Sequence, residues 1–78
     1  MDYKEFLENK IYNLPEDTLG DKIRKIRYIN KISQKEFSTL VGCGDYTIWA
    51  WENDKFKPNI KYRKKIIQVF NLSENYFD

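Results

Sequence analysis

Four side chains at one helical spacing are the first feature of this sequence that could do chemistry. They are Tyr46, Trp49, Ala50 and Asn53. On a helix, positions i, i+3, i+4 and i+7 project from the same side, which we call the reading face. An amide can pair with adenine or bond to a phosphate, and apolar groups can contact thymine methyl groups. The reading face therefore carries groups that can recognise the edges of DNA bases.

The same face allows a second interpretation. Two exposed aromatic rings, Tyr46 and Trp49, also make the kind of apolar patch at which another protein binds. The charges nearby favour DNA, because residues 54–65 contain six Lys and Arg and one acid. Lys55 and Lys57 follow the reading face directly, and we expect them to contact phosphates. Lys64 and Lys65 are more typical of a solvated helix face.

The charge of the whole chain is unevenly distributed. The net charge is +2, but residues 1–17 carry two Lys against five acids. Residues 18–78 carry twelve Lys and Arg against seven acids, and they contain the reading face. A basic domain of this kind favours a polyanionic partner.

Residue usage excludes several classes of chemistry. The chain has no histidine and one cysteine, Cys43, so it cannot form an internal disulfide. A zinc site and a histidine-based catalytic site both lack their ligands. No nucleophile with an adjacent base is visible, so we expect no enzyme activity, no metal and no cofactor. For Cys43 we expect a spectator thiol, with a redox role as the alternative.

Length and hydropathy limit the architecture. No apolar run approaches the roughly 20 residues that span a bilayer, and the first residues do not resemble a signal peptide, so we expect a cytoplasmic protein. Seventy-eight residues make one small domain, in which 17% aromatic residues must supply much of the core. We expect no separate ligand-sensing domain, and therefore control through dimerisation, abundance or another protein.

The hydrophobic spacing predicts an all-α chain. Residues 2–13 place four apolar side chains at helical intervals, which predicts an amphipathic helix that docks on the domain or on a second subunit. These side chains are Tyr3, Phe6, Leu7 and Ile11. Pro15 then breaks the chain. We therefore divide it into an N-terminal helix and linker, 1–17, and a second unit, 18–78.

Five further segments are predicted as helical within residues 18–78. The first runs from its N-cap Thr18 to about Asn30, the second begins after Ser33 and ends at Gly42, and the third covers 45–53. The fourth runs from its cap Asn59 to about Phe70, and residues 73–77 form a short last one. Glu36 completes a capping box with Ser33.

The same spacing assigns side chains to the core or to water. The expected core side chains are Leu19, Ile23, Ile26, Ile29, Phe37, Leu40, Val41, Ile48, Trp51, Ile60, Ile66, Ile67 and Phe70. Four basic side chains are expected in water, namely Lys22, Arg24, Lys25 and Lys31. For a dimer surface we expect Tyr76, Phe77 and the loop 56–58.

Residues 18–77 resemble the Cro/repressor-type helix-turn-helix of phage and bacterial transcriptional regulators, called the XRE family. The matching positions are Gly20, Ile23, Arg24, Arg27, Ser33, Gln34, Ser38, Gly42, Ile48, Trp51, Glu52 and Pro58, followed by a final Leu-Ser-x-x-Tyr-Phe. The resemblance implies a lambda-repressor-like fold whose second motif helix enters the DNA major groove. It also implies a transcriptional regulator, such as a Cro-like repressor, that binds a two-fold operator as a homodimer.

The resemblance also implies roles for particular residues. Gln34 would anchor the protein to a phosphate, with a solvated glutamine as the alternative, and Arg27 would form a shielded ion pair with Glu52. The residues expected to contact DNA are Gln34, Lys35, Gly44, Asp45, Tyr46, Thr47, Trp49, Ala50, Asn53, Lys55 and Lys57.

The chain departs from the family pattern at four positions. Ser38 matches as a small residue but replaces the usual alanine, Asp54 replaces a common glycine, and Asp45 and Tyr46 replace small or amide residues. Phosphates repel an acid at position 45. The second hypothesis is therefore an antitoxin-like or anti-repressor component that uses the same fold to bind a protein.

Overall fold

Four helices make up the computed structural model, which describes residues 14–78. They are α2, Leu19–Ile29; α3, Gln34–Val41; α4, Asp45–Glu52; and α5, Ile60–Phe70. No strand occurs in these residues, in agreement with the all-α prediction. With eight or eleven residues each, none of the helices in this part of the chain could span a lipid bilayer.

The predicted five-helix count is not found. Residues 74–77 form turns, in which the N–H groups of Tyr76 and Asp78 donate to the carbonyls of Ser73 and Asn75, both at 3.0 Å. These bonds join residues three apart, so the segment is too tight and too short to continue as an α-helix. The helix predicted over residues 2–13 lies outside the described residues.

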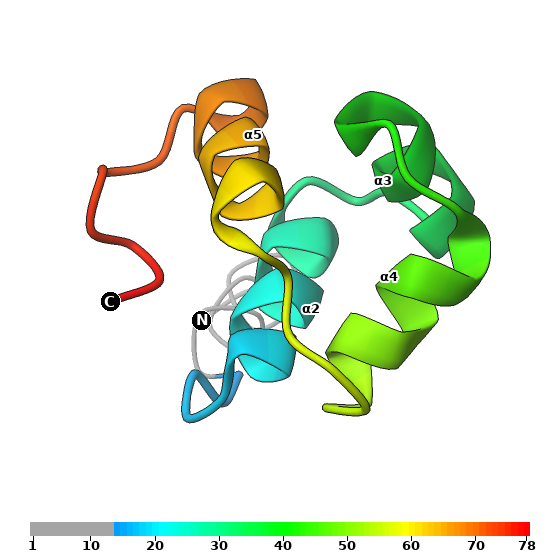
Figure 1. The fold of residues 1–78 in the computed structure, drawn as a ribbon, viewed down its shortest axis with the longest axis horizontal. Helices are drawn as coiled ribbons and strands as arrows, with labels where there is room; N and C mark the ends of the chain where they lie inside the picture. The colour runs from blue at the N-terminus through cyan, green and yellow to red at the C-terminus, as the bar shows by residue number, and fades with distance from the viewer. Residues whose placement is uncertain (1–13) are drawn as a thin grey trace, which may run out of the picture.

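The helices surround one small core. α4 packs against α2 and α3, and α3 also packs against α5. Figure 1 shows α4 to the right of α2 and α5 above α2, with the C-terminal tail on the far side of α5. Ile23, Phe37, Ile48 and Ile66, one from each helix, are fully buried at the centre. The burial of Ile48 therefore fixes α4 to the rest of the domain.

The predicted helix starts and the glycine stop are confirmed. The hydroxyl of Thr18 accepts from the N–H of Asp21 at 3.0 Å, and the carbonyl oxygen of the Asn59 side chain accepts from the N–H of Tyr62 at 2.9 Å. Ser33 forms the complete capping box, and Gly42 ends α3 with a left-handed φ of 79°. These features depend on residues within one turn of each other, which is why the sequence predicts them well.

Three predicted core residues are exposed, so those predictions are wrong. Ile29, Leu40 and Ile60 keep 40%, 49% and 66% of their surface in contact with solvent. Ile29 and Leu40 lie in the last turns of α2 and α3, and Ile60 is the first residue of α5. Helical spacing gives the direction of a side chain, but burial at the end of a short helix also depends on what the rest of the fold places there.

Two lysines predicted to stay in water have partners in the fold. Lys25 is buried and pairs with Glu16, and Lys22 donates to the backbone carbonyl of Tyr76 at 2.9 Å. The segments before α2 and after α5 supply these partners, so helical periodicity in α2 alone does not reveal them. Long basic side chains can bury their aliphatic stems while the charged end finds an oxygen. Lys31 is exposed, as predicted.

Part of the predicted dimer surface is also in the core. Pro58 and Phe77 are buried within the chain itself, Tyr76 is half-buried, and Phe56 and Lys57 are the exposed members of that set. A chain of this length has few large apolar side chains for its core. Pro58 from the loop and Phe77 from the tail therefore pack into the core.

Candidate nucleic-acid interface

The bend between α3 and α4 is short and tightly bonded. The N–H groups of Gly42 and Cys43 both donate to the carbonyl of Ser38, at 2.8 and 3.0 Å. Gly44 is the N-cap of α4 in an extended conformation, and it supplies no side-chain cap. The geometry is that of a helix-turn-helix, with α4 held across the end of α3.

One hydrogen bond ties the start of α4 to α3. The buried hydroxyl of Ser38 lies 2.7 Å from Oδ1 of Asp45 and also 2.7 Å from the carbonyl oxygen of Lys35. Since a hydroxyl has one proton, the carboxylate and the carbonyl compete for it. This contact holds one carboxylate oxygen of Asp45 toward α3. The two departures from the family pattern at positions 38 and 45 are therefore one interaction.

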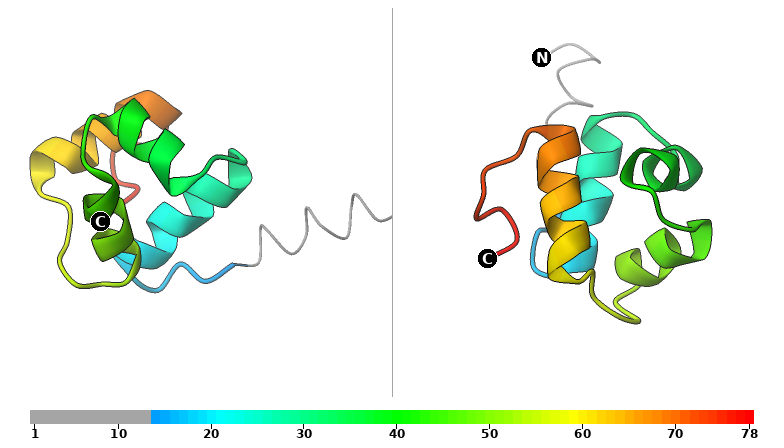
Figure 2. Two further views of the ribbon diagram at one scale, coloured as in Figure 1. Left: turned by 90° about the vertical axis from the view of Figure 1, so that its right-hand side faces the viewer. Right: turned by 45° about the horizontal axis from the view of Figure 1, so that its top comes forward.

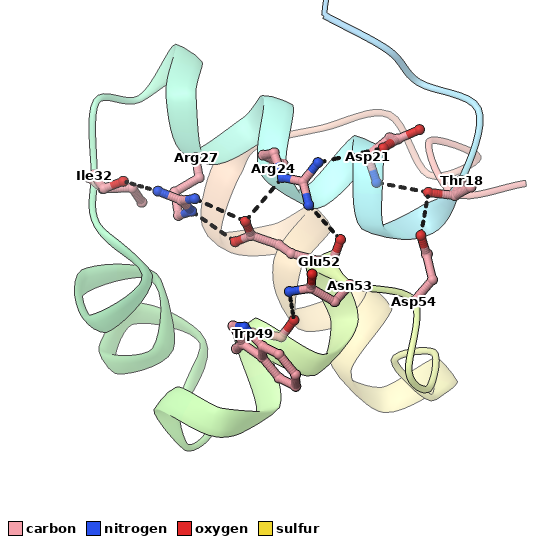
Figure 3. Close-up of polar contacts among 9 residues, drawn as sticks. All are labelled: Thr18, Asp21, Arg24, Arg27, Ile32, Trp49, Glu52, Asn53 and Asp54. Atoms are coloured by element: carbon pink, nitrogen blue, oxygen red, sulfur yellow. Dashed lines mark hydrogen bonds and ion pairs between the residues drawn. The ribbon is translucent and has the colours of Figure 1, made fainter.

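Three of the four reading-face residues are exposed on the outer side of α4. Tyr46 is 67% exposed, Trp49 is 40% exposed, and Asn53 is exposed just after the helix. The side-chain amide of Asn53 donates to the carbonyl of Trp49 at 2.8 Å (Figure 3). One of its amide hydrogens is therefore engaged within the protein. Figure 2, left, turns this side of the molecule toward the viewer, with α4 at the front.

The sequence places Ala50 on the reading face as well, and this prediction is wrong. Its side chain is fully buried. The loop after α4 folds back along the helix, because the N–H of Lys55 donates to the carbonyl of Ala50 at 2.9 Å. In the same loop the ring of Phe56 reaches Tyr46, one turn before Ala50. A methyl group in that position cannot contact a base.

The backfolded loop adds a residue that sequence reasoning missed. Ring centroids of Tyr46 and Trp49 lie 5.6 Å apart, and those of Tyr46 and Phe56 lie 6.5 Å apart. Phe56 is 46% exposed. We call Tyr46, Trp49 and Phe56 the aromatic cluster. One feature of the sequence could have identified Phe56. It is a phenylalanine between two lysines directly after the reading face, in a loop where a solvated segment would carry only polar residues.

The basic and polar residues expected to contact DNA lie at both ends of the α3–α4 unit. Lys55 and Lys57 are exposed in the loop after α4, and Lys35 is exposed in the first turn of α3. Gln34 is the first residue of α3 and is half-buried, as is Thr47 in the first turn of α4. Of the eleven residues expected at the interface, the fold therefore removes Ala50 alone from the surface.

The sharp turn into this loop is made by Asp54. Its φ of 55° lies in the left-handed region, where glycine is favoured, and its carboxylate accepts from the hydroxyl of Thr18 at 3.3 Å. Aspartate tolerates this conformation better than most residues because its short polar side chain can bond locally. The turn directs Lys55 and Phe56 back along α4.

A buried ion pair supports α4 from behind. Glu52 is 3% exposed, and Arg27 donates to both of its carboxylate oxygens, Nε at 2.8 Å and Nη2 at 2.9 Å (Figure 3). The hydrogen bond with Glu52 raises the pKa of Arg27 above its usual value. Arg24, which the sequence places in water, also lies 3.5 Å from this carboxylate and donates to the carbonyl of Glu52 at 2.7 Å. Both arginines therefore attach the end of α4 to α2.

Cys43 is half-buried in the bend. Burial raises the pKa of its thiol, and the negative charge of Asp45 raises it further. A thiol with a raised pKa stays protonated at neutral pH and is a weak nucleophile, which disfavours a redox role.

The comparison with known protein families agrees with this geometry. No curated protein and no solved structure matches the chain. A family model described as a helix-turn-helix domain matches residues 20–77, which is more than half of the chain and includes all of α3, α4 and α5 and all of α2 except Leu19. The chain therefore belongs to the helix-turn-helix domain family of the XRE/Cro-type class.

Proposed function

We propose that this protein is a DNA-binding transcriptional regulator that lays α4 in the major groove. The observation that carries the proposal is the two-sided character of α4. Ile48 and Trp51 are buried against the domain, while Tyr46, Trp49 and Asn53 are exposed on the other side. Membership of the helix-turn-helix family supports the same reading.

Contacts to phosphates would set the position of α4. Lys55 and Lys57 are exposed at one end of α4, and Lys35 is exposed beside the N-terminus of α3, where Gln34 begins the helix. Helix N-termini attract anions through their free N–H groups and dipole. Gly44, Asp45 and Thr47 belong to the first turn of α4, at the end that enters the groove in this docking mode.

The protein would act as a homodimer that occupies a two-fold operator. Helix-turn-helix dimers bind half-sites about one helical turn, roughly 34–36 Å, apart, and the symmetry of the site mirrors that of the protein. Occupying such a site blocks other proteins from it, which makes repression the expected mode of action. A two-fold consensus selected from a random duplex pool would support this assembly, and an asymmetric one would contradict it.

A salt titration of binding to random duplex DNA tests the proposal. We expect a dissociation constant in the micromolar range or below. The logarithm of the association constant should fall with the logarithm of the salt concentration at a slope of several units, because each phosphate contact contributes about 0.9. The double variant Lys55→Ala/Lys57→Ala should reduce this slope by about two units. The matched control is Lys64→Ala/Lys65→Ala, which removes the same charge from α5 and should leave the slope unchanged.

Equal slopes for the two double variants would show that net charge alone governs binding and that α4 is not the contact surface. No binding at about 50 mM salt would overturn the DNA proposal as a whole.

The aromatic cluster favours one alternative function. Three exposed rings in contact are also suited to a protein partner, as in an antitoxin-like or anti-repressor component that keeps the fold. In that case substitution of Tyr46 would abolish a protein complex and leave any weak DNA binding unchanged.

A further inference from the structure

We propose that the aromatic cluster recognises the 5-methyl groups of thymine, so that the preferred half-site is rich in thymine at the bases facing Tyr46, Trp49 and Phe56. The inference rests on the proposed function, because it names the base feature that the DNA-facing surface selects. It also assigns Phe56, a loop residue, to base recognition together with the helix.

The cluster is one continuous surface built from two segments. Tyr46 and Trp49 are one turn apart on α4, with ring centroids separated by 5.6 Å, and the Phe56 ring lies 6.5 Å from that of Tyr46. All three side chains remain 40% or more exposed despite these contacts. Their shared surface is therefore available to a ligand.

The loop that carries Phe56 is held in place at both ends. The Lys55 N–H bonds to the carbonyl of Ala50 at 2.9 Å, and the buried Pro58 anchors the chain two residues after Phe56. The carbonyl of Pro58 also accepts from Nε of Arg63 at 2.8 Å. Phe56 is thus presented from a fixed backbone, so that ordering it on binding costs little entropy.

The chemistry of this surface matches one base. In the major groove, thymine alone presents a methyl group, while the other base edges present mainly hydrogen-bonding groups. Aromatic rings can bury such a methyl group and gain from its removal from water. The polar edges of guanine and cytosine would lose water on this surface without gaining enough partners.

The lysines beside the cluster favour DNA as the occupant. Lys55 and Lys57 are exposed on either side of Phe56 in the chain, where they complement the phosphates that border the groove. The nearest acid on α4, Asp45, is bonded through Oδ1 to the buried hydroxyl of Ser38. An apolar surface bordered by lysines is suited to a methyl-lined groove between phosphate backbones.

The test compares thymine with uracil, which lacks only the methyl group. Binding of the wild-type protein is measured at one salt concentration to a duplex of alternating A and T clamped by G·C pairs, and to the same duplex with uracil for thymine. Each buried methyl group contributes about a factor of four, so two or three contacts predict at least tenfold weaker binding to the uracil duplex. The salt slope should be the same for both, because the phosphates are unchanged.

A second experiment adds a methyl group to a different base, cytosine. Replacing cytosine by 5-methylcytosine in an alternating G·C duplex should strengthen binding, because the new methyl group occupies the equivalent ring position. The variant Phe56→Ser should reduce the thymine-to-uracil ratio. The matched control Ile29→Ser, which removes a similarly exposed apolar side chain from α2, should preserve that ratio.

The outcomes separate this inference from the proposed function. Salt-dependent binding of equal strength to the thymine and uracil duplexes would overturn methyl recognition and leave DNA binding intact. No salt-dependent binding to either duplex would overturn both. A Phe56→Ser variant that changes the oligomeric state but not the thymine-to-uracil ratio would assign the cluster to contact between two copies of the chain.

Discussion

Glu52 is the residue on which the position of α4 depends most. Its carboxylate is buried, and Arg27 binds both oxygens in a parallel pair of hydrogen bonds. Such a bidentate pair is geometrically specific, so it fixes the rotation of α4 as well as its distance from α2. The sequence predicts this pair only through the family resemblance, because Arg27 and Glu52 are 25 positions apart. The added contact of Arg24 depends on tertiary packing and was not predicted.

We expect Glu52→Ala to destabilise the domain by about 3–5 kcal/mol, because it leaves the Arg27 charge without its buried partner. For a domain of this size, that corresponds to a fall in melting temperature of at least ~10 °C. Thermal unfolding followed by circular dichroism measures it. Glu74→Ala, at an exposed site in the tail, is the control and should melt like the wild type. An unchanged melting temperature for Glu52→Ala would mean that the ion pair does not support the fold.

At the scale of elements, the close approach of α2 and α4 is set by Gly20. A Cβ atom at this position would lie 2.4 Å from the carbonyl oxygen of Trp51 and 3.0 Å from that of Glu52. Both are backbone atoms, so the two helices would have to move apart. Glycine is therefore required here for space, and not for a left-handed conformation.

We expect Gly20→Ser to destabilise the domain by about 1–3 kcal/mol, even though serine is the better helix former, because overpacking outweighs propensity. The matched control is Gly44→Ser, where the nearest atom to an added Cβ is 3.9 Å away and φ is −80°. The hydroxyl of the introduced serine can cap α4, so we expect no loss of stability from Gly44→Ser. Chemical denaturation of both variants provides the comparison. If both were equally stable, the helix contact would be looser than the structure indicates.

The elements also show why some features could be predicted and others could not. Caps and stops arise from residues within one turn, and Thr18, Ser33, Gly42 and Asn59 behave as their sequence context predicts. The burial of a side chain depends on which other segment packs against it, and the hydrophobic periodicity of one helix carries no information about that segment. Ala50 has the spacing of an outer residue, but its side chain is fully buried in the fold. The same loop places Phe56 beside Tyr46, a contact between segments ten residues apart.

At the scale of the whole molecule, two weak acids in different parts of the fold resist ionisation. Burial raises the pKa of Cys43 above its ordinary 9.0 and that of Tyr76 above its ordinary 10.0, with the charges of Asp45 and Glu16 acting in the same direction. The folded state thus keeps protons that the unfolded state releases. These two groups therefore leave stability unaffected well below pH 9.0, where both states hold the protons, and stability falls as pH rises through 9.0 toward the raised pKa values.

We expect the melting temperature to fall more steeply between about pH 9 and 10.5 in the wild type than in Cys43→Ala, because the variant has lost the thiol from this balance. Both proteins should show the same pH dependence between pH 6 and 8. Differential scanning calorimetry of both proteins between about pH 6 and 10.5 measures the melting temperatures. A wild type whose alkaline slope equals that of Cys43→Ala would mean that the thiol ionises as easily in the folded protein as in the unfolded chain.

The link between Ser38 and Asp45 also constrains the order in which this protein can evolve. If the acid changes first, the Ser38 hydroxyl keeps an acceptor, since the carbonyl of Lys35 is equally near. If the serine changes first, the carboxylate of Asp45 loses the hydroxyl donor that Ser38 supplies. A change at position 45 is therefore the permissive first step, and a change at position 38 is the hazardous one.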